Sequence, residues 1–365
     1  MKSLTVPNNL TQPLDHLRIA MLRMTMKNYW LRRMYCDSAN RLGLSFLLLS
    51  GIYLAISLKW SIVLLVLGPL VLGYPHLVAS YRFLQKPLLP LGSQLTTQKV
   101  FRIFLFLTAA SLCIRFFTTR FDSITQLPYG SWEILLSIAA LGLIRIKLQT
   151  IRHWIVALLT LIVTAVILNL AWFYPMAFVG FALILHNWVA FGHWFLAAKD
   201  FKNKFVVVLA TGLFALIHIF IFKGFFDSWI AFPKLSFLST QSFEASGWVL
   251  ASWTRDPLIW NRMIVIYTFG LSLHYFVWLK AIPQCLDQKA VPNSFRRSFE
   301  QLRQDCGEHT TIAIFIVAVI ALSLFLFTSV AGPIYFGLAM LHGWLEFTFL
   351  NVAIFSKVVN ISRSV

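Results

Sequence analysis

Apolar runs long enough to cross a membrane recur along this chain from residue 42 to near its C-terminal end. A helix needs about 20 mainly apolar residues to cross the hydrocarbon core of a bilayer. The 365 residues are 59% hydrophobic and 12% charged, against about 25% charged in a typical soluble domain. We therefore predict an all-α, polytopic integral membrane bundle of about ten transmembrane helices. The spans are expected near residues 42–58, 61–83, 101–117, 132–146, 153–171, 173–198, 205–226, 260–282, 310–330 and 332–355.

The basic residues are distributed unevenly among the segments that join these spans. With the N-terminus placed in the cytoplasm, the predicted inner segments hold 24 of the 31 lysines and arginines and the outer segments hold 7. An excess of lysine and arginine is typical of the cytoplasmic loops of membrane proteins. We therefore predict that both termini are cytoplasmic. The net charge of +18 then indicates contact with anionic lipids at the cytoplasmic face rather than binding of nucleic acid.

The chain divides into a basic N-terminal segment, one bundle and a short tail. Residues 15–35 mix apolar and basic side chains, which predicts a helix lying at the membrane interface; a solvated basic tail is the alternative. Apolar residues at helical spacing in 294–302 predict a short amphipathic helix. The predicted parts are a cytoplasmic segment 1–41, a transmembrane bundle 42–356 with a long outer loop 227–259 and a cytoplasmic loop 283–309, and a cytoplasmic tail 357–365.

Histidines are concentrated inside the predicted spans. Ionisable side chains in a bilayer are costly and usually mark function. With a rise of about 1.5 Å per residue, five of these histidines lie within roughly 20 Å of the inner surface, on four separate helices. They are His76, His186, His193, His274 and His342. This matched depth predicts a shared site, although a single intramembrane histidine more often only bonds a neighbouring helix. His218, on an antiparallel span, either joins the site or merely forms a hydrogen bond.

The spacing along the helices indicates which side chains act together. His342 and Glu346 are four residues apart, so the imidazole and the carboxylate lie on one helix face and can chelate one metal ion. His186 and His193 are seven residues apart and share a face of another helix. We predict His76, His186, His274 and His342 as metal ligands. Glu346 and His193 are predicted as the catalytic pair, each acting as an additional ligand or supporting the ligands.

The ligand types narrow the choice of cofactor. Neutral imidazoles with at most one carboxylate and no cysteine suit iron, zinc or copper, and do not suit magnesium or calcium. Iron(II) is the first choice, because a histidine-rich iron site with open positions would activate dioxygen, and zinc and copper are alternatives. Haem held by two facing histidines is a further alternative, less favoured because more than two histidines share one depth. The clustered histidine boxes of membrane desaturases and glycine-rich phosphate loops are absent from the sequence.

The run Gly73-Tyr-Pro-His76 on an early span, with further histidines on later spans, resembles the bacterial Brp/Blh-type β-carotene 15,15′-dioxygenases. The resemblance implies an all-helical membrane enzyme whose intramembrane histidines bind iron and which cleaves a carotenoid oxidatively to retinal. It implies His76 as a ligand, together with the histidines at 186, 193, 274 and 342. The chain departs from the family pattern after His76, where Leu-Val-Ala-Ser-Tyr81 stands in place of Gly-Ala-x-Asp-His.

We therefore expect a membrane-embedded, histidine-ligated non-haem iron oxygenase in a bacterial cytoplasmic membrane. Its substrates would be dioxygen and a hydrophobic, lipid-soluble molecule, with carotenoid cleavage as one candidate reaction. Three alternatives use the same residues differently. A proton-coupled transporter would use the histidines and Glu346 as a relay, a b-type haem protein would carry electrons, and a structural or assembly protein would use them only for packing.

Overall fold

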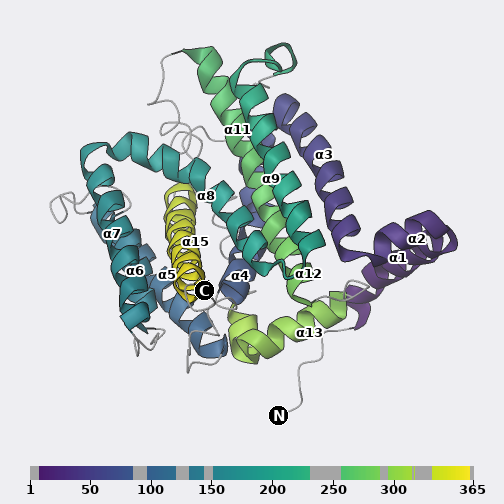
Figure 1. Ribbon diagram of the computed structural model, residues 1–365, viewed down its shortest axis with the longest axis horizontal. Coiled ribbons are helices and arrows are strands. Elements are labelled where there is room, and N and C mark those ends of the chain that lie inside the picture. Colours follow the sequence, from purple (N-terminus) through teal and green to yellow (C-terminus); the bar gives the residue numbers. More distant parts are fainter. Residues whose placement is uncertain are drawn as a thin grey trace.

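The computed structural model of the chain describes residues 8–84, 97–120, 131–143, 151–230, 256–287, 295–314, 316 and 331–361, and these residues form helices and no strands (Figure 1). The all-α prediction is confirmed for this part of the chain. The helices that build the bundle are α3 (Ser38–Leu67), α4 (Tyr74–Phe83), α5 (Thr97–Arg120), α6 (Ser131–Leu143), α7 (Ile151–Phe173), α8 (Pro175–Ala197), α9 (Phe201–Phe222), α11 (Pro257–Phe276) and α15 (Ala331–Ile361).

Four of the described helices are long and apolar enough to cross a bilayer, as expected of an integral membrane protein. These candidate spans are Ser38–Ser61, Trp154–Phe173, Phe201–Phe222 and Leu258–Leu286. The helices α7 and α9 expose rows of large apolar side chains, including Leu158, Ile162 and Val208. Such surfaces are unfavourable in water and suited to acyl chains. The count of ten spans stays a prediction, and most of the expected span 310–330 and of the outer loop 227–259 lie outside the described residues.

The first two expected spans are separated by a break inside one long helix. Trp60 has non-helical backbone angles (φ −139°, ψ 42°) within α3, at the position where the sequence analysis places the turn between 42–58 and 61–83. After this break the chain runs through a π-helical segment, η1 (Gly68–Gly73), into α4. A second π-helical segment, η4 (Val277–Ala281), follows α11. Short π segments within α-helices are frequent at functional sites.

Segments predicted to be cytoplasmic meet at one end of the bundle. Arg41, at the start of α3, donates from Nε to Gln284 Oε1 of α12 (Ile282–Asp287) over 3.2 Å. The ammonium of Lys280 donates to Ser45 Oγ over 2.8 Å. Arg82 at the end of α4 pairs with Asp305 of α13 (Phe295–Cys306) over 2.5 Å, and α13 lies along the expected amphipathic stretch. These contacts bring together three of the segments predicted to lie on the inner side.

The N-terminal segment is helical up to the bundle. It forms α1 (Asn8–Lys27) and α2 (Tyr29–Cys36), which project beyond α3 (Figure 1). Leu17, Met21, Met24 and Trp30 are each more than 60% exposed on these helices. This amphipathic character fits the interfacial helix expected within 15–35. At the other end of the chain, α15 continues to Ile361, past the expected start of the tail at 357.

The site-bearing helices lie at the centre of the molecule. In the apolar stretch of the candidate span that contains α11, 89% of the residues are buried. The corresponding share is 22% in α7 and 28% in α9. The helix α15 is flanked by α5, α6 and α7 on one side and by α8 on the other (Figure 1). Burial on this scale leaves polar side chains of α11 and α15 with only protein partners, because water and lipid are both excluded. The four central helices α4, α8, α11 and α15 therefore decide how the histidines meet.

Candidate metal centre

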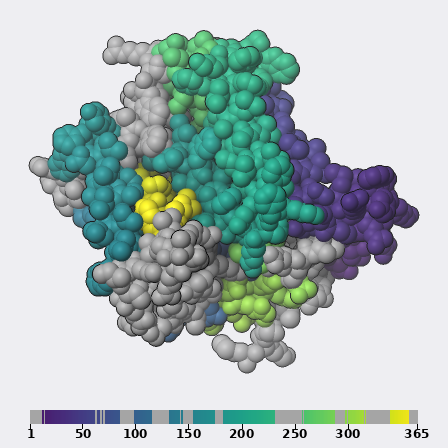
Figure 2. All heavy atoms as spheres, in the orientation of Figure 1, coloured from purple at the N-terminus to yellow at the C-terminus, as the bar shows by residue number. Residues whose placement is uncertain are grey.

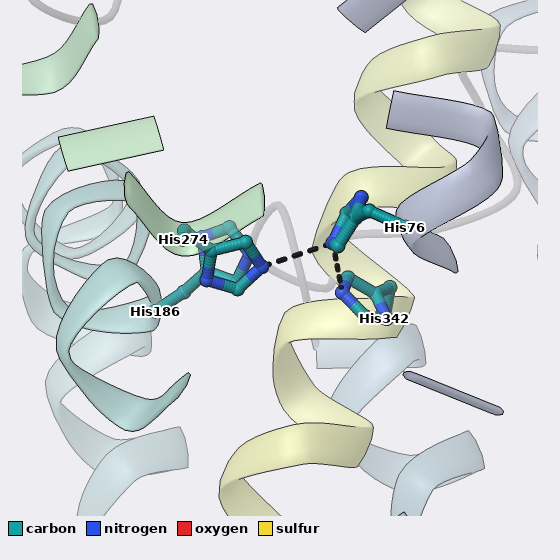
Figure 3. A group of neighbouring side chains, drawn as sticks. All are labelled: His76, His186, His274 and His342. Carbon is teal, nitrogen blue, oxygen red and sulfur yellow. Dashed lines mark hydrogen bonds between the residues drawn. The ribbon is translucent and has the colours of Figure 1, made fainter. Parts of the chain in front are cut away.

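The four histidines predicted as metal ligands converge at one point. His76 comes from α4, His186 from α8, His274 from α11 and His342 from α15, and one ring nitrogen from each lies within 4.8 Å of all the others. Figure 3 shows the rings turned toward one another from separate helices. His76, His274 and His342 are at most 4% exposed, whereas His186 keeps part of its surface open.

Close helix packing positions the ligand from α8. The ring of His186 rests on Gly343 of α15, where an added Cβ would stand only 3.3 Å from its Cδ2 atom. The next residue, Asn187, rests on Gly270 of α11, where an added Cβ would stand 2.9 Å from Nδ2. A glycine on each neighbouring helix therefore lets α8 approach both closely. Asn187 is held in this packing and does not reach the histidines as a hydrogen-bond partner in the described structure.

Hydrogen bonds fix the tautomers of two of the rings. His76 Nδ1 lies 2.8 Å from the carbonyl oxygen of Gly73, which can only accept, so Nδ1 carries the proton. The Ser80 hydroxyl lies 2.9 Å from the carbonyl oxygen of Leu77 and 3.0 Å from His342 Nδ1, and when it donates to Leu77 its oxygen accepts a proton from Nδ1. Both neutral rings therefore present an unprotonated Nε2 with a lone pair.

These lone pairs face each other at short range. His76 Nε2 lies 2.7 Å from His342 Nε2, and His274 Nε2 lies 2.9 Å from His76 Nε2. A proton on His274 Nε2 would satisfy the second contact. When both rings carry their protons on Nδ1, the first contact has no proton and its two facing lone pairs repel. A cation placed between the two nitrogens would turn this repulsion into attraction.

The carboxyl group of Glu346 lies at the same point. Its Oε1 lies 2.7 Å from His342 Nε2 and 3.7 Å from His274 Nε2, and the side chain is 0% exposed. Among the described residues neither carboxylate oxygen has a hydrogen-bond partner of normal geometry, and the same holds for His186 Nε2. Buried polar atoms without partners are rare in native proteins, and a bound ion is one of the causes. The i, i+4 spacing predicted from the sequence thus places Glu346 beside the four histidines.

The other two intramembrane histidines have different roles. His193 lies on α8 two turns from His186, and its Nε2 donates to the main-chain carbonyl of Glu346 over 2.8 Å. It therefore supports the segment of α15 that carries the carboxylate and does not offer that nitrogen to the cluster. His218 donates from Nδ1 to the carbonyl of Phe214 over 2.7 Å and packs among aromatic rings, which is the hydrogen-bonding alternative left open by the sequence.

Two side chains at the cluster were not expected from the sequence. Ser80 lies one turn after His76 on α4 and orients His342 from there; the i, i+4 spacing is the signal that would have found it. Tyr275 packs its ring 4.8 Å, centre to centre, from that of His76. It follows His274 directly in the chain, and nothing in its spacing separates it from an ordinary core aromatic residue.

A narrow, half-open hollow with a cavity volume of about 20 Å³ adjoins the cluster between α8 and α15. His186 is the one ionisable residue among the described side chains that line it. The lining is otherwise apolar or aromatic and consists of Ala182, Leu183, Leu185 and Val189 on α8, and Ala339, Met340, Gly343, Trp344 and Phe347 on α15.

The cluster offers four imidazoles and one carboxylate to a single point in a dry interior. Donors of these types hold transition metals such as iron, zinc and copper. Ser80 and the Gly73 carbonyl orient two of the rings from behind, as supporting groups do for metal-binding histidines. Comparison of the chain with models of known protein families, with curated proteins and with solved structures found no match.

Proposed function

We propose that this protein is a membrane-embedded metal oxygenase in which His76, His186, His274 and His342 bind one iron(II) ion. The observation that carries the proposal is the contact between His76 and His342, whose unprotonated Nε2 atoms lie 2.7 Å apart with Glu346 Oε1 beside them. A bound dication would give these two nitrogens and the Glu346 oxygen an attractive partner. The ionised Glu346 carboxylate would in turn supply the compensating negative charge that a buried ion requires.

The donor set suits iron, zinc and copper. Iron(II) is proposed first because a histidine-rich iron(II) site with open positions would activate dioxygen. Zinc and copper remain alternatives, and haem is less suited because a porphyrin does not fit between nitrogens this close.

The surroundings support a hydrophobic substrate. When bound, iron(II) with open positions would activate dioxygen. The protein holds the rings through Gly73 and Ser80, excludes water by burial, and places an apolar hollow beside His186. Oxidative cleavage of a carotenoid, the reaction implied by the resemblance to the Brp/Blh-type enzymes, fits these surroundings. In that reaction one C=C bond and the O–O bond break and two C=O bonds form, so that both oxygen atoms end in the products.

A proton relay is the second candidate, because an extra proton between His76 and His342 would also relieve their repulsion. One proton would not serve His186 Nε2 and both oxygens of Glu346, which lack hydrogen-bond partners among the described residues. A metal ion serves them together. The proton relay predicts that the purified protein holds no metal and still moves protons. Metal analysis therefore distinguishes the relay from the oxygenase.

We also place the chain in a bacterial cytoplasmic membrane with about ten crossings and both termini inside, and with anionic lipids at the inner face. The excess of lysine and arginine in alternate segments supports this topology. Cysteines introduced singly at Lys27 and Lys223 test it, in a background where the native cysteines are replaced. A membrane-impermeant maleimide added to intact cells should label the cysteine at 223 and spare the one at 27. The reverse pattern would contradict the orientation.

The activity is tested in bacterial cells that accumulate β-carotene. Cells producing the wild-type protein should lose colour and form retinal under air, and cells producing the His76→Ala/His274→Ala protein should do neither. Iron(II)-loaded purified protein treated with nitric oxide should give the half-integer-spin signal of a non-haem iron nitrosyl. A metal-bound protein that leaves β-carotene intact would exclude this substrate and keep the metal centre. A metal-free protein would exclude the oxygenase.

A further inference from the structure

The histidine cluster is open on one side only, as far as the described residues show. His76, His274 and His342 are at most 4% exposed, and Glu346 is 0% exposed. His186 is partly exposed and lines the hollow between α8 and α15. Among the four histidines, His186 therefore lies nearest to the surface of the described structure.

The wall of the hollow indicates what can occupy it. Its described lining contains no lysine, arginine, aspartate or glutamate, so an ionic head group would lose its hydration there without gaining a partner. Its cavity volume is about 20 Å³, far below the roughly 300–1,000 Å³ found for small-molecule sites, so only a group as slender as a hydrocarbon chain can enter it. The occupant that fits is an uncharged, slender apolar chain.

Small residues keep the hollow open where the two helices face each other. Ala182 lies one turn before His186 on α8, and Ala339 lies one turn before Gly343 on α15. At Gly343 a Cβ would already stand 3.3 Å from the His186 ring, so a side chain there would take the space next to the ligand. Figure 2 shows atoms of α15 at the molecular surface between α7 and the α8–α9 side, so α15 is not fully covered by the neighbouring described helices.

We propose that the hollow between α8 and α15 is the access route by which an uncharged apolar chain reaches the metal centre, and that Ala182, Ala339 and Gly343 set its width. The proposal rests on the proposed function for the presence of the metal. The binding of an apolar chain in the hollow can be measured independently of the metal.

The test uses the full-length protein in detergent and two photoreactive probes, an alkyl diazirine with an uncharged end and the same chain ending in a carboxylate. Cross-linked residues are mapped by mass spectrometry, and iron is measured on the same samples. The uncharged probe should label residues 182–189 and 339–347 more strongly than the carboxylate probe does. Ala339→Phe should lower this labelling about tenfold, which corresponds to about 1.4 kcal/mol of lost binding. Bound iron should not change, because Ala339 is not a ligand.

Gly212→Phe is the matched control. Gly212 lies on α9, and a Cβ there meets nothing within 4 Å, so the added ring should leave labelling of the hollow unchanged. Ala182→Phe narrows the same space from the opposite wall and keeps the test valid if Ala339→Phe does not fold. Equal labelling of the hollow in the wild type, Ala339→Phe and Ala182→Phe would overturn the access route. That result would not affect the proposed metal centre. Protein that is labelled in the hollow but binds no iron would overturn the proposed function instead.

Discussion

The imidazoles of His76 and His342 stand 266 positions apart in the chain, and their Nε2 atoms meet at 2.7 Å. Each ring is oriented from its far side, His76 by the Gly73 carbonyl and His342 by the Ser80 hydroxyl. The folding energy that brings two unprotonated nitrogens together must come from the surrounding helix packing. A bound cation, as proposed, would return energy at that point, as binding of a metal stabilises the fold that holds it.

Replacing Glu346 by glutamine should weaken metal binding. The substitution keeps the size of the side chain and removes the one negative charge beside the four imidazoles. We expect the metal affinity to fall by about 10–100-fold, the range seen when groups that support a metal site are lost. A competition titration with a chelator of known affinity measures it. The matched control is Glu133→Gln, which changes another buried carboxyl, 1% exposed on α6, and should leave the affinity unaltered. Equal affinity of the Glu346→Gln and wild-type proteins would remove the carboxylate from the site.

Replacing His193 by alanine should lower the stability of the folded protein. The amount of bound metal should change little. The variant loses the N–H donated to the Glu346 carbonyl and leaves a cavity beside Trp278, a change of about 2 kcal/mol. Thermal unfolding in detergent measures the loss, and His193→Gln, which keeps an N–H donor, should recover part of it. The exposed His309 provides the control, since His309→Ala should change neither quantity. Loss of the metal from His193→Ala at saturating iron would instead make His193 a ligand.

The ion pair between Asp227 and Arg262 should make the free energy of unfolding depend on pH in the acid range. Arg262 donates from Nε to Asp227 Oδ1 over 2.9 Å and from Nη2 to Oδ2, and these bonds lower the pKa of Asp227 below its usual 3.8. The charged form is favoured in the folded state, so the stabilisation is present above that value and is lost as the pH falls through the lowered pKa. Asp227→Asn should cost about 1 kcal/mol at pH 7. Unfolding measured at pH 7, 5 and 3 should show the same difference at pH 7 and 5 and a smaller one at pH 3, and an equal difference at all three would contradict the ion pair.

The sequence predicted the cluster because helix geometry translates position into depth. His76, His186, His274 and His342 were selected by their distance from the expected inner surface, and all four meet in the structure. His193 has a suitable depth but faces the α15 backbone, because the rotation of α8 about its axis is set by side-chain packing against Gly343 and Gly270. That packing involves contacts between distant segments, which spacing along one helix does not contain.

The supporting groups were harder to find for the same reason. Ser80 on α4 orients His342 on α15, and only its i, i+4 spacing from His76 could have indicated this role. The break at Trp60 was expected between two apolar runs and is present. The hollow beside His186 depends on small residues of two helices that face each other, a relationship that one sequence does not reveal. Local periodicity therefore predicted elements and depths, and the packing of separate helices decided the roles.

Metal analysis of the detergent-purified protein tests the central claim most directly. Wild-type protein reconstituted with iron(II) and freed of excess metal should retain about one equivalent, as expected for a single site. The His76→Ala/His342→Ala protein should retain close to none. The His16→Ala/His309→Ala protein, altered at two exposed histidines, should match the wild type. Wild-type protein that retains no transition metal, or a His76→Ala/His342→Ala protein that retains as much as the wild type, would contradict the account.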